Sequence, residues 1–140
     1  MATDEDSPRA IIARLLASDP DAAVDTSIAI LEQLASSLVG MIGEHGFETL
    51  LYRSAHRVNL DFPWLLYDPR TRPADPELNQ LRDCFDGQDK APAYAASELL
   101  LTTLLDILAV LIGEHMTKLI VQPALDRAST RNKSKEQHNG

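Results

Sequence analysis

Two five-residue segments of this chain are nearly identical and lie seventy residues apart, which is half of its 140 residues. Met41–His45 reads MIGEH, and Leu111–His115 reads LIGEH. A repeat at this offset predicts two related structural units, and we interpret the chain as an internal pseudo-twofold duplication. The apolar flanks correspond at the same offset: Ile30 and Leu31 with Leu100 and Leu101, Leu34 with Leu104, Leu38 with Leu108, and Leu50 and Leu51 with Ile120 and Val121.

An apolar stretch precedes each copy of the repeat and predicts one long buried helix in each half. From Val24 to Ile42 the apolar residues step by four and three positions, which keeps them on one side of a helix. Met41 widens this seam, so we expect burial on more than one side. From Leu99 to Ile112 only three polar residues interrupt the apolar run.

The repeated glycines predict a close contact between the two long helices. Gly43 and Gly113 carry no side chain, so the backbones could approach where the helices cross. Glycine also weakens a helix by about 1 kcal/mol relative to alanine. The sequence therefore leaves open whether the helices continue through Gly43, Gly46 and Gly113 or break there.

Two shorter helices complete the expected fold. Ser7 and Pro8 are typical of a helix start, because serine can accept a hydrogen bond from a free amide and proline suits the first turn. A second short helix is expected from Pro76 or Glu77 to Phe85. No strand-like alternation of useful length occurs. The sequence thus predicts an all-α bundle of about four helices, two long and two short.

The two halves are joined by a proline-rich connection. Three prolines between Asn59 and Glu77 follow the Phe62–Tyr67 segment and exclude a regular helix. We expect its aromatic residues to pack back onto the bundle. A connection this long also hints at function, so the aromatics are candidate interaction residues: Phe62, Trp64 and Tyr67.

The chain ends differ in charge from the body. We expect an acidic, disordered N-terminus over residues 1–7, a single helical domain over 8–125, and a disordered basic tail over 126–140. The tail has four basic and two acidic residues, whereas the whole chain carries a formal charge of −8. A tail of this kind could fold back on the acidic body or bind an acidic partner.

Charge and composition indicate a cytoplasmic protein. A net charge of −8 opposes binding to nucleic acid and to anionic membrane surfaces. The central apolar run of the second half is shorter than the roughly 20 residues of a membrane span, and it contains Asp106. The N-terminus lacks the features of an export signal, and the single cysteine, Cys84, cannot form an internal disulfide.

The repeat brings two glutamates and two histidines into related positions, which predicts a candidate ligand pocket. Its residues are Glu44, His45, Arg53, Glu114 and His115. Helical metal sites use Glu-x-x-His, in which both ligands share one face, whereas adjacent residues point about 100° apart. We therefore expect no metal and no cofactor. The alternative interpretation is that Glu44 and Glu114 pair with basic residues or cap exposed amides, while His45 and His115 border the core.

A second candidate lies just after the first repeat. Arg53, His56 and Arg57 follow near Tyr52 and ahead of Trp64. Together with Glu44 or Glu48 they could line a pocket that binds a small anion. The alternative is an ordinary salt-bridged helix surface.

No catalytic motif is recognisable in the chain. It has no phosphate-binding glycine loop, no G-x-S-x-G and no H-E-x-x-H. The sequence favours a non-catalytic regulatory or protein-interaction module. Its long helices are more apolar than a chain of this size can cover, so we expect a homodimer. The alternative is a ligand-binding or metal-binding sensor, or a small enzyme, with a pocket at the repeat.

Overall fold

The computed structural model describes residues 7–71 and 78–138. These residues form helices and connections without any strand, so the predicted all-α class is confirmed. The acidic residues 1–6 and the expected helix start at Pro76 or Glu77 lie outside the described residues. In chain order the elements are α1 (Pro8–Ser18), the short 3-10 turn η2 (Pro20–Ala22), α2 (Ala23–Asn59), α3 (Asn79–Phe85), α4 (Lys90–Ile112) and α5 (Glu114–His138).

The N-terminus of α1 is capped as predicted. The backbone N–H of Ala10 donates to Ser7 Oγ at 3.2 Å, and Pro8 occupies the first turn. Eleven residues are too few for a stable isolated helix, so α1 depends on its packing against α4 and α5. Ile12 and Leu16 supply this contact, and both are fully buried.

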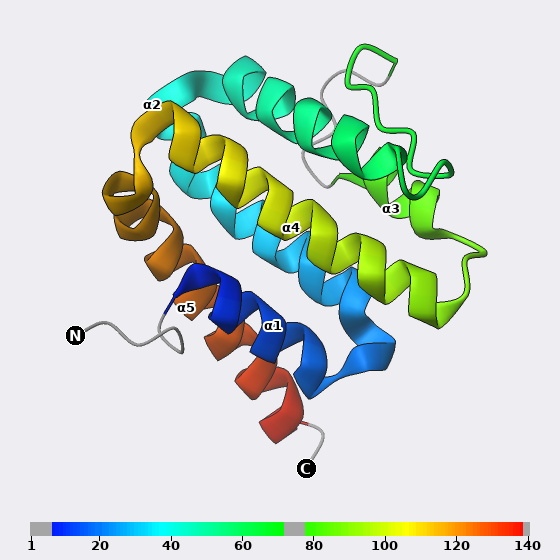
Figure 1. The fold of residues 1–140 in the computed structure, drawn as a ribbon. Helices are drawn as coiled ribbons and strands as arrows, with labels where there is room; N and C mark the ends of the chain where they lie inside the picture. Colours follow the sequence, from blue (N-terminus) through cyan, green and yellow to red (C-terminus); the bar gives the residue numbers. More distant parts are fainter. Residues whose placement is uncertain (1–6, 72–77, 139–140) are drawn as a thin grey trace.

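The centre of the bundle is formed by α2 and α4, which make the most extensive contact between elements. The ion pair between Lys90 Nζ and Asp21 Oδ1, at 3.1 Å, brings the starts of the two helices together. From there residues 23–42 of α2 and the whole of α4 run in the same direction (Figure 1). The two long apolar helices predicted from the sequence therefore lie side by side.

Both long helices are interrupted at the glycine of the repeat. Gly43 has φ 79° and ψ 168°, which divides α2 into residues 23–42 and residues 44–59. Gly113 has φ 90° and ψ 154° and separates α4 from α5. This backbone region is almost exclusive to glycine. We call Gly43 and Gly113 the hinge glycines; because the helices run in parallel, both hinges lie at one end of the bundle, the hinge end (Figure 1).

The role of the hinge glycines differs from the predicted one. A Cβ atom added at Gly43 or Gly113 would have no neighbour within 4 Å, so these positions are not where two backbones touch. The glycines are needed because of their positive φ. The break at Gly113 also explains why residues 7–71 and 78–138 form five α-helices instead of about four.

After each hinge the chain folds back along the central pair. Residues 44–59 of α2 cover one side, next to α3, whereas α5 and α1 cover the opposite side (Figure 1). Arg127 fixes α5 to α2, because its Nε donates to Gln33 Oε1 at 2.7 Å and its Nη2 to Ser37 Oγ at 2.8 Å. Each central helix is thus followed by a further helical segment that packs against the bundle.

The last helix is longer than the sequence suggests. α5 contains Pro123 and continues past it to His138, into the segment 126–140 that the sequence predicts to be a tail. Buried residues on both sides of the proline hold the helix on the bundle, namely Val121, Ala124, Leu125 and Ala128. Proline removes one backbone hydrogen bond, but tertiary packing of this kind can keep the helix continuous.

Two helical segments, residues 20–59 and α4, are long and apolar enough to cross a membrane by length and composition alone. Parts of both are buried inside the bundle, 39% of the most apolar window in the first and 44% in the second. Helices at the core of a soluble bundle have the same composition, so this property alone favours neither environment.

Candidate functional site

Four of the five predicted pocket residues lie directly after the hinge glycines, at the hinge end of the bundle. Glu44 and Glu114 are the first residues after the hinge glycines, each followed by its histidine. A glutamate in the first helical turn interacts favourably with the helix dipole, which gives both residues a local structural role. The side chains of Glu44, His45, Glu114 and His115 are all exposed to solvent.

Arg53 lies farther along the helix. It follows His45 by eight residues on the same helical segment, which corresponds to about 12 Å of helix. It is also exposed. The chain therefore places Arg53 on the outer face of α2, away from the hinge.

The carboxylates and histidines of the hinge end do not converge on one point. Within residues 7–71 and 78–130, whose side chains the structure describes, no group of three or more His, Cys, Asp or Glu residues is arranged to hold a metal ion. This agrees with the geometry of adjacent Glu and His residues on a helix, which point in different directions.

The hinge end instead presents apolar side chains. Eight large apolar residues are exposed in the described part of the chain, and six of them lie within six residues of a hinge glycine. Val110 is 85% exposed and Leu111 64%. We call these six residues the hinge-end surface: Met41, Ile42, Val110, Leu111, Met116 and Leu119.

The hinge-end surface corrects one sequence-based expectation. The helical spacing assigns Met41 and Ile42 to the buried seam, but their exposed fractions are 51% and 37%. The buried seam of α2 ends at Leu38, which is fully buried. Met41 and Ile42 come directly before Gly43, where the chain changes direction, and no part of the bundle covers them fully. The exposure of Met41 and Ile42 follows from the backbone conformation of Gly43, and the sequence left that conformation open.

The hinge-end surface concentrates exposed apolar side chains near the two hinge glycines. Single exposed apolar residues are common on soluble proteins, whereas larger exposed apolar patches mark interaction sites. The exposed fractions of the six side chains range from 37% to 85%. Polar and charged residues adjoin this surface: Glu44, His45, Glu114, His115 and Lys118.

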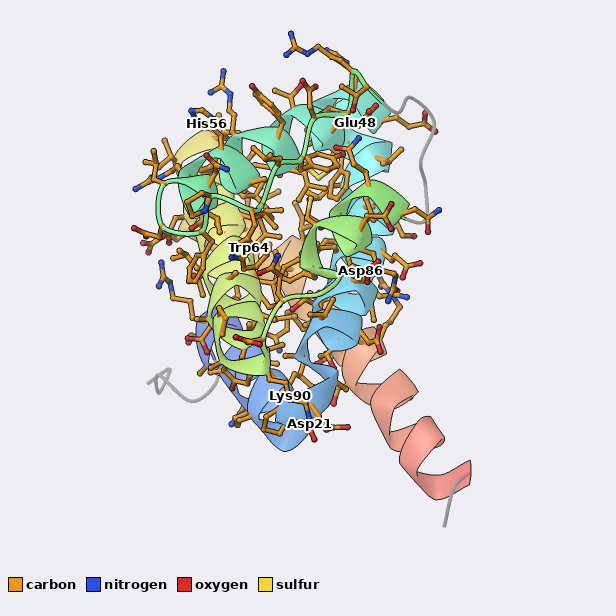
Figure 2. All side chains as sticks on the ribbon, turned by 90° about the vertical axis from the view of Figure 1, so that its right-hand side faces the viewer. Asp21, Glu48, His56, Trp64, Asp86 and Lys90 are labelled. Carbon is orange, nitrogen blue, oxygen red and sulfur yellow. The ribbon has the colours of Figure 1, made fainter. Side chains whose placement is uncertain are left out.

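The predicted aromatic interaction residues have another environment. Tyr67 is buried, and Phe62 and Trp64 are half-buried. The ring of Trp64 packs edge-to-face against Phe62 at 5.8 Å and against Phe85 of α3 at 5.3 Å between centroids. Figure 2 labels Trp64 in a view from the end opposite the hinge. The aromatics pack back onto the bundle as expected, and their contacts attach the connection to it.

Hydrogen bonds from Asn59 hold the same connection. Its Nδ2 donates to the carbonyl oxygens of Pro63 at 2.9 Å and Leu65 at 3.0 Å. Cys84 is half-buried on α3, with its Sγ 3.5 Å from the carbonyl oxygen of Leu66. These contacts therefore hold the connection against the bundle at the end opposite the hinge.

Comparisons with protein-family models, with curated proteins and with solved structures find no match to this chain.

Proposed function

We propose that this chain is a non-catalytic regulatory or protein-interaction module that forms a homodimer through its hinge-end surface. The observation that carries the proposal is the exposure of six large apolar side chains at one end of an otherwise well-buried bundle. Burial of apolar surface is the main favourable term in protein association, so a second copy covering this surface would stabilise both.

A pseudo-twofold duplication is part of the same proposal. Support comes from the repeated sequence and from the matching φ and ψ of the hinge glycines. Residues 51–60 and 121–130 are also buried, half-buried and exposed in the same order at all ten positions. Ser27 and Ser97, seventy residues apart, are both buried, and the Oγ of each has no hydrogen-bond partner.

The duplication makes the hinge-end surface suitable for a second copy. A twofold interface is self-complementary, because each patch meets its own copy. One glutamate and one histidine adjoin the hinge-end surface after each hinge glycine. A second copy related by a twofold axis can therefore bring Glu44 of one subunit near His115 of the other. The charge of −8 disfavours an anionic membrane or nucleic acid as the occupant, and we place the protein in the cytoplasm.

The alternative is a ligand-binding or metal-binding sensor, or a small enzyme, at the Gly-Glu-His segments. The exposure of Glu44, His45, Glu114 and His115 favours the interaction module, because ligand sites usually bury most of the ligand surface. Metal analysis of the purified protein, and its melting temperature with added Zn²⁺ or Mn²⁺, test the alternative. Bound metal, or a melting shift that Glu44→Gln and Glu114→Gln abolish, would support it.

Light scattering coupled to size-exclusion chromatography tests the homodimer. We expect the unaltered chain to elute with twice its 15.4 kDa mass. The double variant Val110→Glu and Leu111→Glu places two charges on the hinge-end surface and should elute as a monomer. The control is Leu60→Glu with Leu66→Glu, two equally exposed leucines outside the surface (76% and 71%), which should remain dimeric.

Circular dichroism of each variant must show the unaltered helix content, so that a monomer is not the result of unfolding. A monomeric unaltered chain at micromolar concentration, or equal loss of dimer in both double variants, would overturn the proposed interface.

A further inference from the structure

Residues 44–59 of α2 carry a second exposed surface with positive charge. Arg53, His56 and Arg57 are all exposed, and their spacing of three and four residues places them on one side of the helix. Figure 2 shows His56 on the outside of the bundle, and Glu48 near the other end of the same segment. We call Arg53, His56 and Arg57 the cationic face.

The arginines of the cationic face differ from most other arginines of the structure. Arg9 pairs with Asp106, and Arg82 pairs with Asp25. Within the described residues, neither Arg53 nor Arg57 has an ion pair or a side-chain hydrogen bond. Two unpaired guanidinium groups one helical turn apart on an acidic protein are available to carboxylates of another molecule.

Tyr52 and Arg70 lie near the cationic face. The ring of His56 stacks on Tyr52, with centroids 6.2 Å apart and an interplanar angle of 24°. The proline-rich connection adds Arg70, whose Nε and Nη2 donate to the two carboxylate oxygens of Asp68 at 3.0 and 2.9 Å. These bonds to Asp68 raise the pKa of Arg70, and Tyr52 raises it further. Arg70 is thus held near Tyr52 by its ion pair with Asp68.

We infer that the cationic face is a docking site for an acidic protein segment. Arg53 and Arg57 are about 6 Å apart along the helix axis, which matches two carboxylates spaced four residues apart on a partner helix. Charge complementarity selects this occupant. The negative charge of the whole chain repels the continuous phosphate backbone of a nucleic acid, whereas a short acidic segment need contact only this face. The site is separate from the hinge-end surface and does not depend on dimer formation.

Fluorescence anisotropy with a labelled peptide tests the inference. The probe is a fluorescein-labelled helical peptide of Ala with Glu at every fourth position, compared with the same peptide carrying Gln. We expect the Glu peptide to bind the full chain at low salt and to bind more weakly at physiological ionic strength, where the Debye length is about 8 Å. The Gln peptide should not bind.

Two double variants with the same loss of charge locate the site. Arg53→Gln with Arg57→Gln should weaken binding of the Glu peptide by about tenfold or more, because it removes both charge-assisted contacts. Arg9→Gln with Arg14→Gln lowers the net charge equally on α1 and should change the affinity less than twofold. Both pairs are exposed, and circular dichroism verifies that each variant is folded.

Three results would overturn the inference: no binding of the Glu peptide at low salt, equal weakening by the two double variants, or binding of single-stranded DNA that is as tight and as sensitive to Arg53 and Arg57. Since light scattering reports the homodimer independently, failure here is distinguishable from failure of the hinge-end interface.

Discussion

Ser27 and Ser97 are unusual residues in this bundle because their hydroxyls are buried without a partner. Their exposed fractions are 2% and 0%, and each lies on a central helix. Ser54 is also buried, but its Oγ donates to the carbonyl oxygen of Leu50 at 2.8 Å. A buried hydroxyl without a hydrogen bond costs about 1–3 kcal/mol. Ser27 and Ser97 should therefore contribute less to the stability of the fold than Ser54, although all three are buried.

Alanine substitution should therefore separate the serines. We expect Ser27→Ala and Ser97→Ala to raise the free energy of unfolding by about 1 kcal/mol, since each removes an unpaired polar group from the core. Ser54→Ala should raise the free energy of unfolding less, because this substitution removes a hydrogen bond worth about 1 kcal/mol. Urea unfolding followed by circular dichroism gives all three values. If Ser27→Ala lowers the free energy of unfolding by more than Ser54→Ala does, the hydroxyl of Ser27 has a hydrogen-bond partner.

At the scale of the elements, the hinge glycines decide how each half folds. Their positive φ ends the straight central helix and returns the chain along the bundle. Gly40 is a useful comparison, because it lies within a helix of the same segment and also has open space around it. The steric surroundings of Gly40 and Gly43 are alike, and only the backbone conformation differs.

Alanine at these positions should have opposite effects. Gly43→Ala and Gly113→Ala should lower the free energy of unfolding by about 1–3 kcal/mol each, because alanine is strained at such φ and ψ values. Gly40→Ala should raise it by about 0.5–1 kcal/mol, as expected in a helix interior. Chemical unfolding measures the three changes. If Gly43→Ala is as stable as Gly40→Ala, the helix does not break at Gly43.

For the whole molecule, dimer formation and stability should be linked. A dimer that unfolds to monomers becomes more stable as its concentration rises. We expect the melting temperature to increase with protein concentration in the unaltered chain. It should be independent of concentration in the variant with Val110→Glu and Leu111→Glu. Differential scanning fluorimetry over a hundredfold range of concentration makes this comparison, and a constant melting temperature in both would contradict the dimer.

The sequence predicts much of this architecture because helical periodicity is a local signal. It identifies the all-α class, the two long helices, the cap at Ser7 and the packed aromatics. It cannot predict the exposure of Met41 and Ile42, because that follows from the turn at Gly43. The same limit applies to Arg53, which the sequence assigns to the same candidate pocket as Glu44 and His45 but which lies about 12 Å farther along the helix.

The parallel arrangement of α2 and α4 has a consequence for synthesis on the ribosome. The largest contact in the bundle joins helices whose starts, Asp21 and Lys90, are about seventy residues apart. When α2 leaves the exit tunnel, the nascent chain has not yet produced the helix that covers Leu31, Leu34 and Leu38. Chains with long-range contacts fold slowly and expose apolar surface meanwhile. Translation must therefore deliver α4 before α4 can cover these leucines, and until then this apolar side of α2 stays exposed.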